Sequence, residues 1–209
     1  MKKILLRYPF YLVTLVVIAS LIWARTSHEQ TVEIAQAMTR LTARVSAIIF
    51  LFVFSASSWR RLSPGDWSAS LLKNRRRLGL TFAYSHTIHL ICFVAFFWLS
   101  GGKPLLSTVI IGGGAYLTMY AMALTSNDWS VKRLRAKNWK RLHKFGVYYL
   151  WLVFFLTYLT RLLKAGDNMA VDVAGLALFL AIMLMRVTAA VIPKRRLTYA
   201  SPDSSQESF

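Results

Sequence analysis

Six long apolar segments divide the chain, and short polar or basic segments separate them. The apolar segments cover approximately residues 8–24, 41–57, 78–99, 105–124, 145–163 and 169–192. An α-helix needs about 20 apolar residues to cross the hydrocarbon core of a bilayer. The hydropathy pattern therefore predicts an all-α membrane protein, a bundle of six transmembrane helices that forms a single domain over residues 1–200.

The positive charge is distributed unevenly between alternate loops. The formal net charge is +18, and 20 of the 26 Lys and Arg residues lie in one set of alternate loops and at the ends of the chain. The other set holds the remaining six, which are Arg25, Arg40, Arg44, Lys103, Arg161 and Lys164. This is the positive-inside pattern, so we expect both termini in the cytoplasm, together with a disordered polar tail at 201–209. Contact with anionic lipid explains this charge, and we expect no nucleic-acid partner.

Two histidines lie inside the third apolar segment, where an ionisable side chain indicates a functional site. His89 is about 18 Å along the helix from the arginine run that ends at Arg77, and His86 is about one turn shallower. A spacing of three residues places both on one helix face. His143 opens the fifth segment, and His28 lies in a loop. Neutral imidazole is a good axial ligand for haem iron, but a histidine that only forms hydrogen bonds between helices gives the same pattern.

Two motifs resemble the ferric reductase-like transmembrane domain family, and within it the haem-binding subunits of bacterial sulfoxide reductases. The first is Arg75-Arg76-Arg77-Leu78-Gly79-Leu80 followed by His89, and the second is Asn138-Trp139-Lys140-Arg141-Leu142-His143-Lys144-Phe145. The resemblance implies a six-span b-type cytochrome of the bacterial inner membrane. It also implies that His89 and His143 bind haem iron, and that a periplasmic molybdopterin reductase accepts the electrons.

The chain departs from the family at Leu156, because the family usually has a histidine 13 residues after the one that opens the fifth span. We expect that histidine to be level with His89 and opposite to it. Three interpretations follow. Haem is held by His89 or His86 with a different sixth ligand, such as a methionine; it is shared by His86 and His143; or the fold has lost its haem.

The favoured function is a membrane electron-transfer subunit that carries haem b on His89, His143 and His86. Electrons enter from a cytoplasmic flavin reductase or from quinol, and leave towards an acceptor on the outer side. The sequence has no flavin or nicotinamide module of its own, so we expect one subunit of an oxidoreductase rather than a complete enzyme. The alternative is a haem-less relative that acts as a membrane scaffold.

Overall fold

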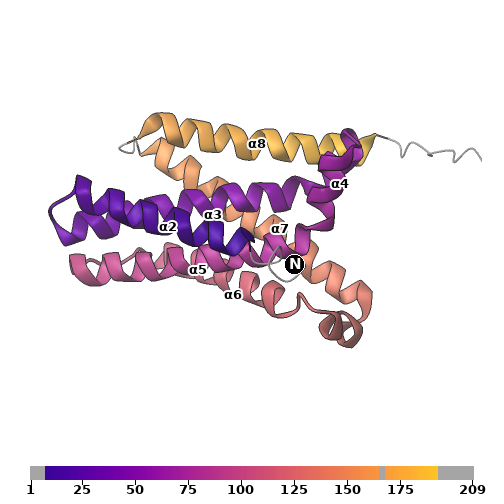
Figure 1. The fold of residues 1–209 in the computed structure, drawn as a ribbon, viewed down its shortest axis with the longest axis horizontal. Helices are drawn as coiled ribbons and strands as arrows, with labels where there is room; N and C mark the ends of the chain where they lie inside the picture. The colour runs from indigo at the N-terminus through magenta and orange to yellow at the C-terminus, as the bar shows by residue number, and fades with distance from the viewer. Residues whose placement is uncertain (1–7, 165–167, 193–209) are drawn as a thin grey trace, which may run out of the picture.

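The chain folds into a bundle of long, roughly antiparallel helices in the computed structural model, which describes residues 8–164 and 168–192 (Figure 1). The helices are α2 (Tyr8–Ser27), α3 (Thr31–Leu62), α4 (Asp66–Lys73), α5 (Arg75–Ser100), α6 (Leu106–Leu124), α7 (Asp128–Leu163) and α8 (Met169–Val191). The described residues contain no strand, which confirms the all-α prediction. The predicted tail at 201–209 lies outside the described residues.

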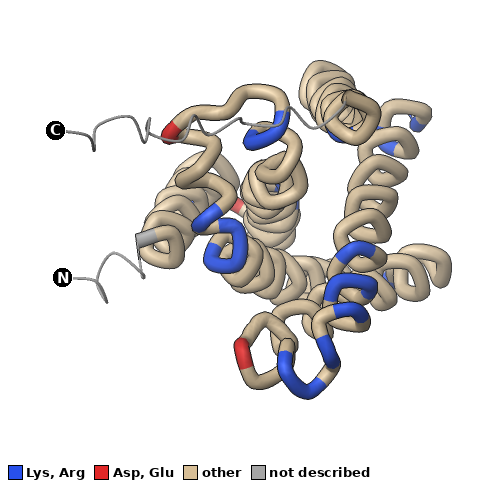
Figure 2. Tube along the Cα trace, turned by 90° about the vertical axis from the view of Figure 1, so that its right-hand side faces the viewer, with Lys and Arg blue, Asp and Glu red and all other residues tan. Residues whose placement is uncertain are grey.

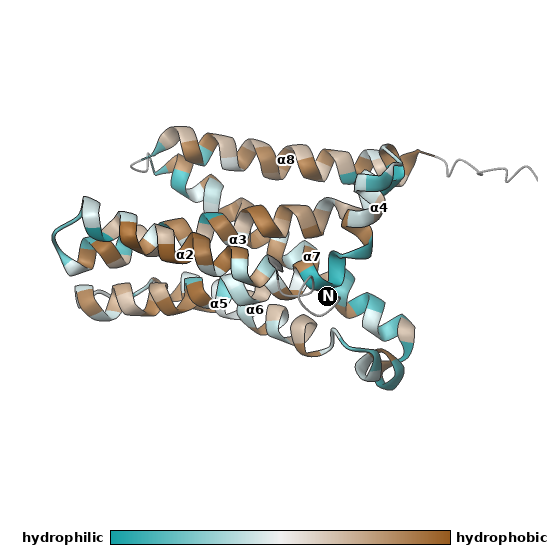
Figure 3. Ribbon diagram, viewed as in Figure 1, coloured by the Kyte–Doolittle hydropathy of each residue, from teal (hydrophilic) through white to brown (hydrophobic). Residues whose placement is uncertain are grey.

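Six of these helices, all but α4, are long and apolar enough to cross a membrane. Large apolar side chains such as Leu12, Ile91 and Leu117 are exposed on the outer faces of the bundle, and apolar residues run along the lengths of the helices (Figure 3). So much exposed apolar surface is unfavourable in water and favourable in lipid, where helices also satisfy their own backbone hydrogen bonds. The chain is therefore a multi-pass membrane protein.

Two helices are longer than the apolar segments that predicted them. Helix α3 begins at Thr31 rather than at residue 41, and α7 begins at Asp128 rather than at residue 145. The α7 extension is rich in basic residues, and the α3 extension mixes polar with apolar residues. A hydropathy pattern therefore detects only the most apolar part of each helix. A kink at Arg135 interrupts the basic extension of α7, because the φ of 61° and ψ of 140° at this residue are not helical.

Helix α3 is the central element and packs most extensively against α5. The contact surface of α3 is built from small residues, including Thr42, Ser46 and Ala47, all of which are buried. Small residues let two helix backbones approach closely within a membrane. This close approach brings polar groups of α3 within hydrogen-bond distance of the histidines of α5.

Helices α7 and α8 are held together by a close contact and by an ion pair. A Cβ atom at Gly175 of α8 would lie 2.3 Å from the ring of Tyr158, so only glycine allows that ring to lie against the helix. Arg161 of α7 and Asp172 of α8 form an ion pair with an N–O distance of 2.8 Å. The side chain of Asp172 is only 1% exposed and that of Arg161 is 35% exposed, so the carboxylate is buried and the guanidinium is partly buried.

Basic residues gather at one end of the bundle, which we call the basic end. It comprises α4, the start of α5 and the first part of α7, and Figure 2 views the bundle from this side. Helix α2 begins and α8 ends towards the same side (Figure 1). The structure thus brings together the basic segments that the loop pattern grouped in the sequence.

Candidate functional site

Two pockets open in the region between α5 and α7, because α7 packs against α6 and α8 rather than closely against α5. The pocket towards the basic end, here called the basic pocket, has a volume of about 510 Å³ and is lined by His143, Met122 and several cations. The second, here called the histidine pocket, has a volume of about 550 Å³ and is lined by His86 and His89. Both volumes are typical of small-molecule and cofactor sites.

An aromatic layer separates the two pockets. Phe50 and Phe82 line the basic pocket, and Phe154 lines the histidine pocket. The ring centroids of Phe50 and Phe82 are 5.3 Å apart, as are those of Phe50 and Phe154. His86 continues the layer, with its ring centroid 5.3 Å from that of Phe82 and 5.4 Å from that of Phe154. These rings connect α3, α5 and α7 at mid-bundle.

His89 is held in the geometry of a metal-binding histidine. Its Nδ1 lies 3.1 Å from the carbonyl oxygen of Thr39. A carbonyl only accepts, so Nδ1 carries the proton and donates it. The Thr42 hydroxyl, 3.4 Å from Nδ1, donates its own hydrogen to the Met38 carbonyl and can only accept from the ring. The neutral ring therefore keeps the lone pair of Nε2, and this orientation by a backbone carbonyl is the usual support of a metal-binding histidine.

His86 is also hydrogen-bonded to α3, but it is enclosed by other rings. Its Nδ1 is 3.0 Å from the Ser46 hydroxyl, which also lies 2.9 Å from the carbonyl oxygen of Thr42. The ring of Tyr116 stacks on it with centroids 4.8 Å apart, and the residue is only 8% exposed. His89 borders the same pocket and is less enclosed. The surroundings therefore favour His89 as a ligand and His86 as a packing residue of the aromatic layer.

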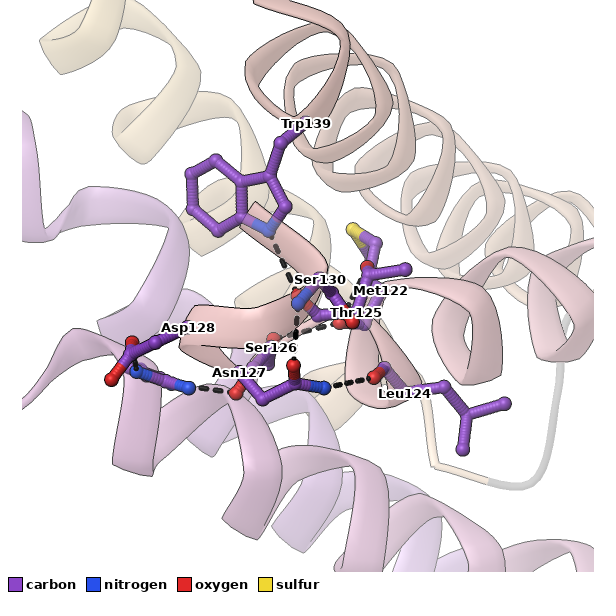
Figure 4. A network of polar contacts seen from close by, with 9 residues as sticks. Met122, Leu124, Thr125, Ser126, Asn127, Asp128, Ser130 and Trp139 are labelled. Atoms are coloured by element: carbon purple, nitrogen blue, oxygen red, sulfur yellow. Dashed lines mark hydrogen bonds and ion pairs between the residues drawn. The ribbon is translucent and has the colours of Figure 1, made fainter. Parts of the chain in front are cut away.

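His143 lies in the basic pocket and is positioned by the turn between α6 and α7. Its ring stacks on that of Trp139 at a centroid distance of 4.1 Å, and its Nε2 is 3.3 Å from the Thr125 hydroxyl. The indole of Trp139 donates to the carbonyl oxygen of Thr125. Asn127 accepts from the backbone of Ser130 and donates to the carbonyl oxygen of Leu124, which fixes the start of α7 (Figure 4).

Arg76 ties this turn to α5. It donates to the carbonyl oxygen of Ser126 and forms an ion pair of 2.8 Å with Asp128. An arginine of the run before the third span therefore links α5 to the start of α7 at the basic end. The network of Figure 4 orients Trp139, and through it the ring of His143.

The structure brings His86 and His89 together and places His143 apart from them, in the other pocket. It does not support one haem shared by His86 and His143, because the aromatic layer lies between their pockets. Met119 and Met122 line the basic pocket with His143, so neither methionine faces His89. His28 lies in the turn between α2 and α3, beside Glu33.

The structure also differs from the expectation that position 156 faces His89. The α7 residues that line the histidine pocket include Val153, Phe154, Thr157 and Arg161, but not Leu156. In a regular helix, 13 residues rotate a side chain by about 220° from the starting face, whereas 14 residues return it to within about 40°. Thr157, rather than Leu156, is thus on the same face of α7 as His143.

Sequence reasoning did not find the polar groups that surround the two histidines. Thr39 and Ser46 belong to the same helix as Arg44, which lines the histidine pocket. Arg161 and Asp172 lie at its border as well. A signal was present, because Arg40 and Arg44 stand one turn apart at the start of an apolar segment. The positive-inside rule, however, only counts these two arginines as charges of a loop and does not indicate that they line a pocket.

The fold and the pocket define a class: a multi-pass helical membrane protein with an imidazole-lined cavity. Comparison with known proteins agrees. Over 123 residues, the chain is 36% identical to the "Protein-methionine-sulfoxide reductase heme-binding subunit MsrQ" of Azospira oryzae, a match that covers 50% of each protein. The MsrQ of Ralstonia nicotianae is 27% identical over 156 residues, which cover 70% of this chain and 68% of that protein.

A third relative is the magnetosome protein MamZ of Magnetospirillum gryphiswaldense, 28% identical over 101 residues, which cover 46% of this chain and 16% of MamZ. No family model matches the chain, and no solved structure matches it significantly. The chain spans about half the length of the first MsrQ relatives that it matches. The resemblance predicted from the two motifs is confirmed, because the chain is similar to several MsrQ proteins over half of its length or more.

Proposed function

We propose that this protein is a membrane electron-transfer subunit that binds b-type haem in the histidine pocket. The observation that carries the proposal is His89, whose Nδ1 donates to the carbonyl oxygen of Thr39 at 3.1 Å and leaves Nε2 as a ligand. The relatives named as haem-binding subunits support the same function.

The residues of the histidine pocket fit an iron porphyrin. The imidazole of His89 is the iron ligand, and apolar residues such as Leu90, Phe93 and Val109 form much of the pocket wall. Arg44 and Arg161 border the pocket, and their guanidinium groups are suited to the two carboxylates that haem carries. Haem supplies one-electron chemistry when bound, while the protein supplies the ligand, the apolar surroundings and the charge.

The charge distribution supports an orientation with the basic end in the cytoplasm, following the positive-inside rule. Electrons then enter at the basic pocket and leave near the histidine pocket, towards the outer face. Exposed cations of α7, including Lys132, Arg133 and Lys137, suit an acidic electron donor such as a flavin reductase; quinol is the other donor class. The acceptor is a reductase at the outer face: the names of the relatives describe a subunit of a methionine-sulfoxide reductase, and the outer position follows from the orientation.

The direct test is an absorption spectrum of the protein purified in detergent from cells supplied with a haem precursor. We expect a reduced-minus-oxidised difference with b-type bands, and haem close to or above one equivalent per chain by pyridine haemochrome assay. A folded, monodisperse but colourless preparation that binds no added haemin contradicts the proposal. That result favours the alternative function, a haem-less scaffold.

Arg44 provides a further prediction, because the structure shows no hydrogen bond or ion pair to it from the part of the chain that is described. It is half-buried and lines the histidine pocket. A charge-assisted hydrogen bond contributes about 1.5–3 kcal/mol, so we expect Arg44→Gln to weaken haemin binding roughly tenfold or more. Arg25→Gln, at the exposed end of α2, is the matched control. Equal haemin affinity of the two variants contradicts the assignment.

A further inference from the structure

The wall that α7 contributes to the histidine pocket is formed by Leu150, Val153, Phe154, Thr157, Tyr158 and Arg161. These positions follow the spacing of one helix face, and none of them is a histidine, methionine or cysteine. We infer that this pocket offers an iron porphyrin one imidazole, that of His89, and leaves the opposite axial position open to a small neutral ligand. The inference rests on the proposed function, and it adds a ligand-binding site to it.

His86 cannot complete the coordination, because axial ligands approach an iron porphyrin from opposite faces. His86 and His89 project from the same face of α5, one turn apart. Their ring centroids are 5.1 Å apart and their planes are inclined by 32°, so the rings lie beside each other rather than facing each other across a metal. His86 is also held between the rings of Phe82 and Tyr116.

The other candidate donors either line the basic pocket or are tyrosines of the histidine pocket that are engaged in packing. His143, Met119 and Met122 line the basic pocket, on the other side of the aromatic layer. The hydroxyl of Tyr116 donates to the backbone carbonyl of His86. The ring of Tyr158 is pressed against Gly175, where an added Cβ would lie 2.3 Å from a ring atom. Both tyrosines therefore have structural partners.

Val153, Phe154 and Thr157 give the α7 wall an apolar surface with one hydroxyl, and Tyr158 and Arg161 lie beside this surface on the same helix face. Val153 and Phe154 present hydrocarbon surface, and Thr157 donates its hydroxyl hydrogen to the carbonyl oxygen of Val153 at 2.8 Å. This hydroxyl is therefore not a donor to a ligand in the pocket. Haem held by a single histidine is the arrangement that leaves room for exogenous ligands, with the polarity of the facing wall deciding which ones bind. This apolar surface favours neutral molecules such as carbon monoxide, because the one cation of the α7 wall, Arg161, is paired with Asp172.

The first experiment records spectra of the haem-loaded, full-length protein with and without carbon monoxide. We expect a high-spin ferric spectrum, and a ferrous form in which most of the haem binds carbon monoxide with a shifted Soret band. A low-spin ferric haem that resists carbon monoxide overturns the inference but leaves the proposed function standing. Absence of haem overturns both, so the two failures are distinguishable.

A pair of variants tests which residue of α7 faces the open position. We expect Thr157→His to convert the haem to a low-spin, six-coordinate form and to reduce the fraction that binds carbon monoxide at least tenfold. Leu156→His adds the same imidazole one position away, outside the pocket lining, and is expected to keep the high-spin spectrum. The inference is overturned if Leu156→His gives the six-coordinate form, or if a folded Thr157→His protein keeps full carbon monoxide binding. Tyr158→Phe removes the nearest phenol, and a changed ferric spectrum in that variant means that tyrosine holds the sixth position.

Discussion

Replacing His89 by alanine is expected to remove the haem of the histidine pocket, reducing its content to below about a tenth of that of the unmodified protein. Changes to groups that only orient a metal ligand typically cost 10- to 100-fold in affinity, and loss of the ligand itself exceeds that range. The residue that replaces it has no donor atom, and His86 is held within the aromatic layer. The measurement is haem content per folded chain, determined by pyridine haemochrome assay after gel filtration.

Two controls make this result specific. His86→Phe keeps an aromatic ring in the layer and removes the hydrogen bond to Ser46, so we expect it to retain most of the haem with a loss of stability of about 1 kcal/mol. For His89→Gly, added imidazole is expected to enter the vacated space and restore haem binding, which excludes misfolding as the cause of the loss. Full haem content in His89→Ala together with loss in His86→Phe would mean that the two roles are reversed.

The architecture could largely be predicted from the sequence, because membrane-spanning helices appear in it as long apolar segments. Each span must satisfy its backbone hydrogen bonds internally and present apolar side chains to lipid, so six apolar segments gave six helices. The polar starts of α3 and α7 could not be predicted in this way. At the start of α7, Asn127 caps the helix, and at the start of α3, Ile34 and Met38 pack with Ala24 of α2. No hydropathy window reports those interactions.

The candidate site could be predicted only in part. Two histidines in one apolar span indicated a site, and the structure places both in one pocket. Their different surroundings depend on α3, where Thr39 and Ser46 are the partners, and contacts between helices cannot be derived from the spacing within one helix. The expectation for Leu156 failed for a similar reason. Counting residues gives the depth of a residue along α7, but the lining of the pocket depends on which face of α7 the residue lies on.

Under the proposed function, the aromatic layer divides the bundle into two pockets with different roles in electron transfer. The basic pocket carries cations and His143 at the end that the charge pattern orients towards the cytoplasm. The histidine pocket lies beyond Phe50, Phe82 and Phe154, whose rings fill the middle of the bundle. Packed rings lead from Phe50 and Phe82, which line the basic pocket, to His86, whose ring centroid is 5.1 Å from that of His89. Under the proposed function, these rings are the shortest packed connection between the two pockets.

The second large effect is expected at Asp172, where replacement by alanine should destabilise the bundle by about 3 kcal/mol. Removing one partner of a buried ion pair leaves an uncompensated charge and typically costs about 3–5 kcal/mol, much more than removing both. The lower end of that range applies here, because the Arg161 side chain that remains is 35% exposed. Asp172 is 1% exposed, and its ion pair with Arg161 links α8 to α7 at the border of the histidine pocket. The carboxylate also lies in the first turn of α8, where negative charge is favoured by the helix dipole. The measurement is unfolding in mixed micelles monitored by circular dichroism.

The exposed pair between Arg76 and Asp128 is the matched control, because it has the same N–O distance of 2.8 Å but side chains that are 48% and 88% exposed. Exposed pairs contribute at most about 1 kcal/mol, so Asp128→Ala should have a small effect. The double variant Arg161→Met with Asp172→Leu replaces both charges by apolar groups and should recover most of the stability lost in Asp172→Ala. Equal losses in Asp172→Ala and Asp128→Ala contradict the buried ion pair, and a double variant no more stable than Asp172→Ala shows that the carboxylate acts through another partner.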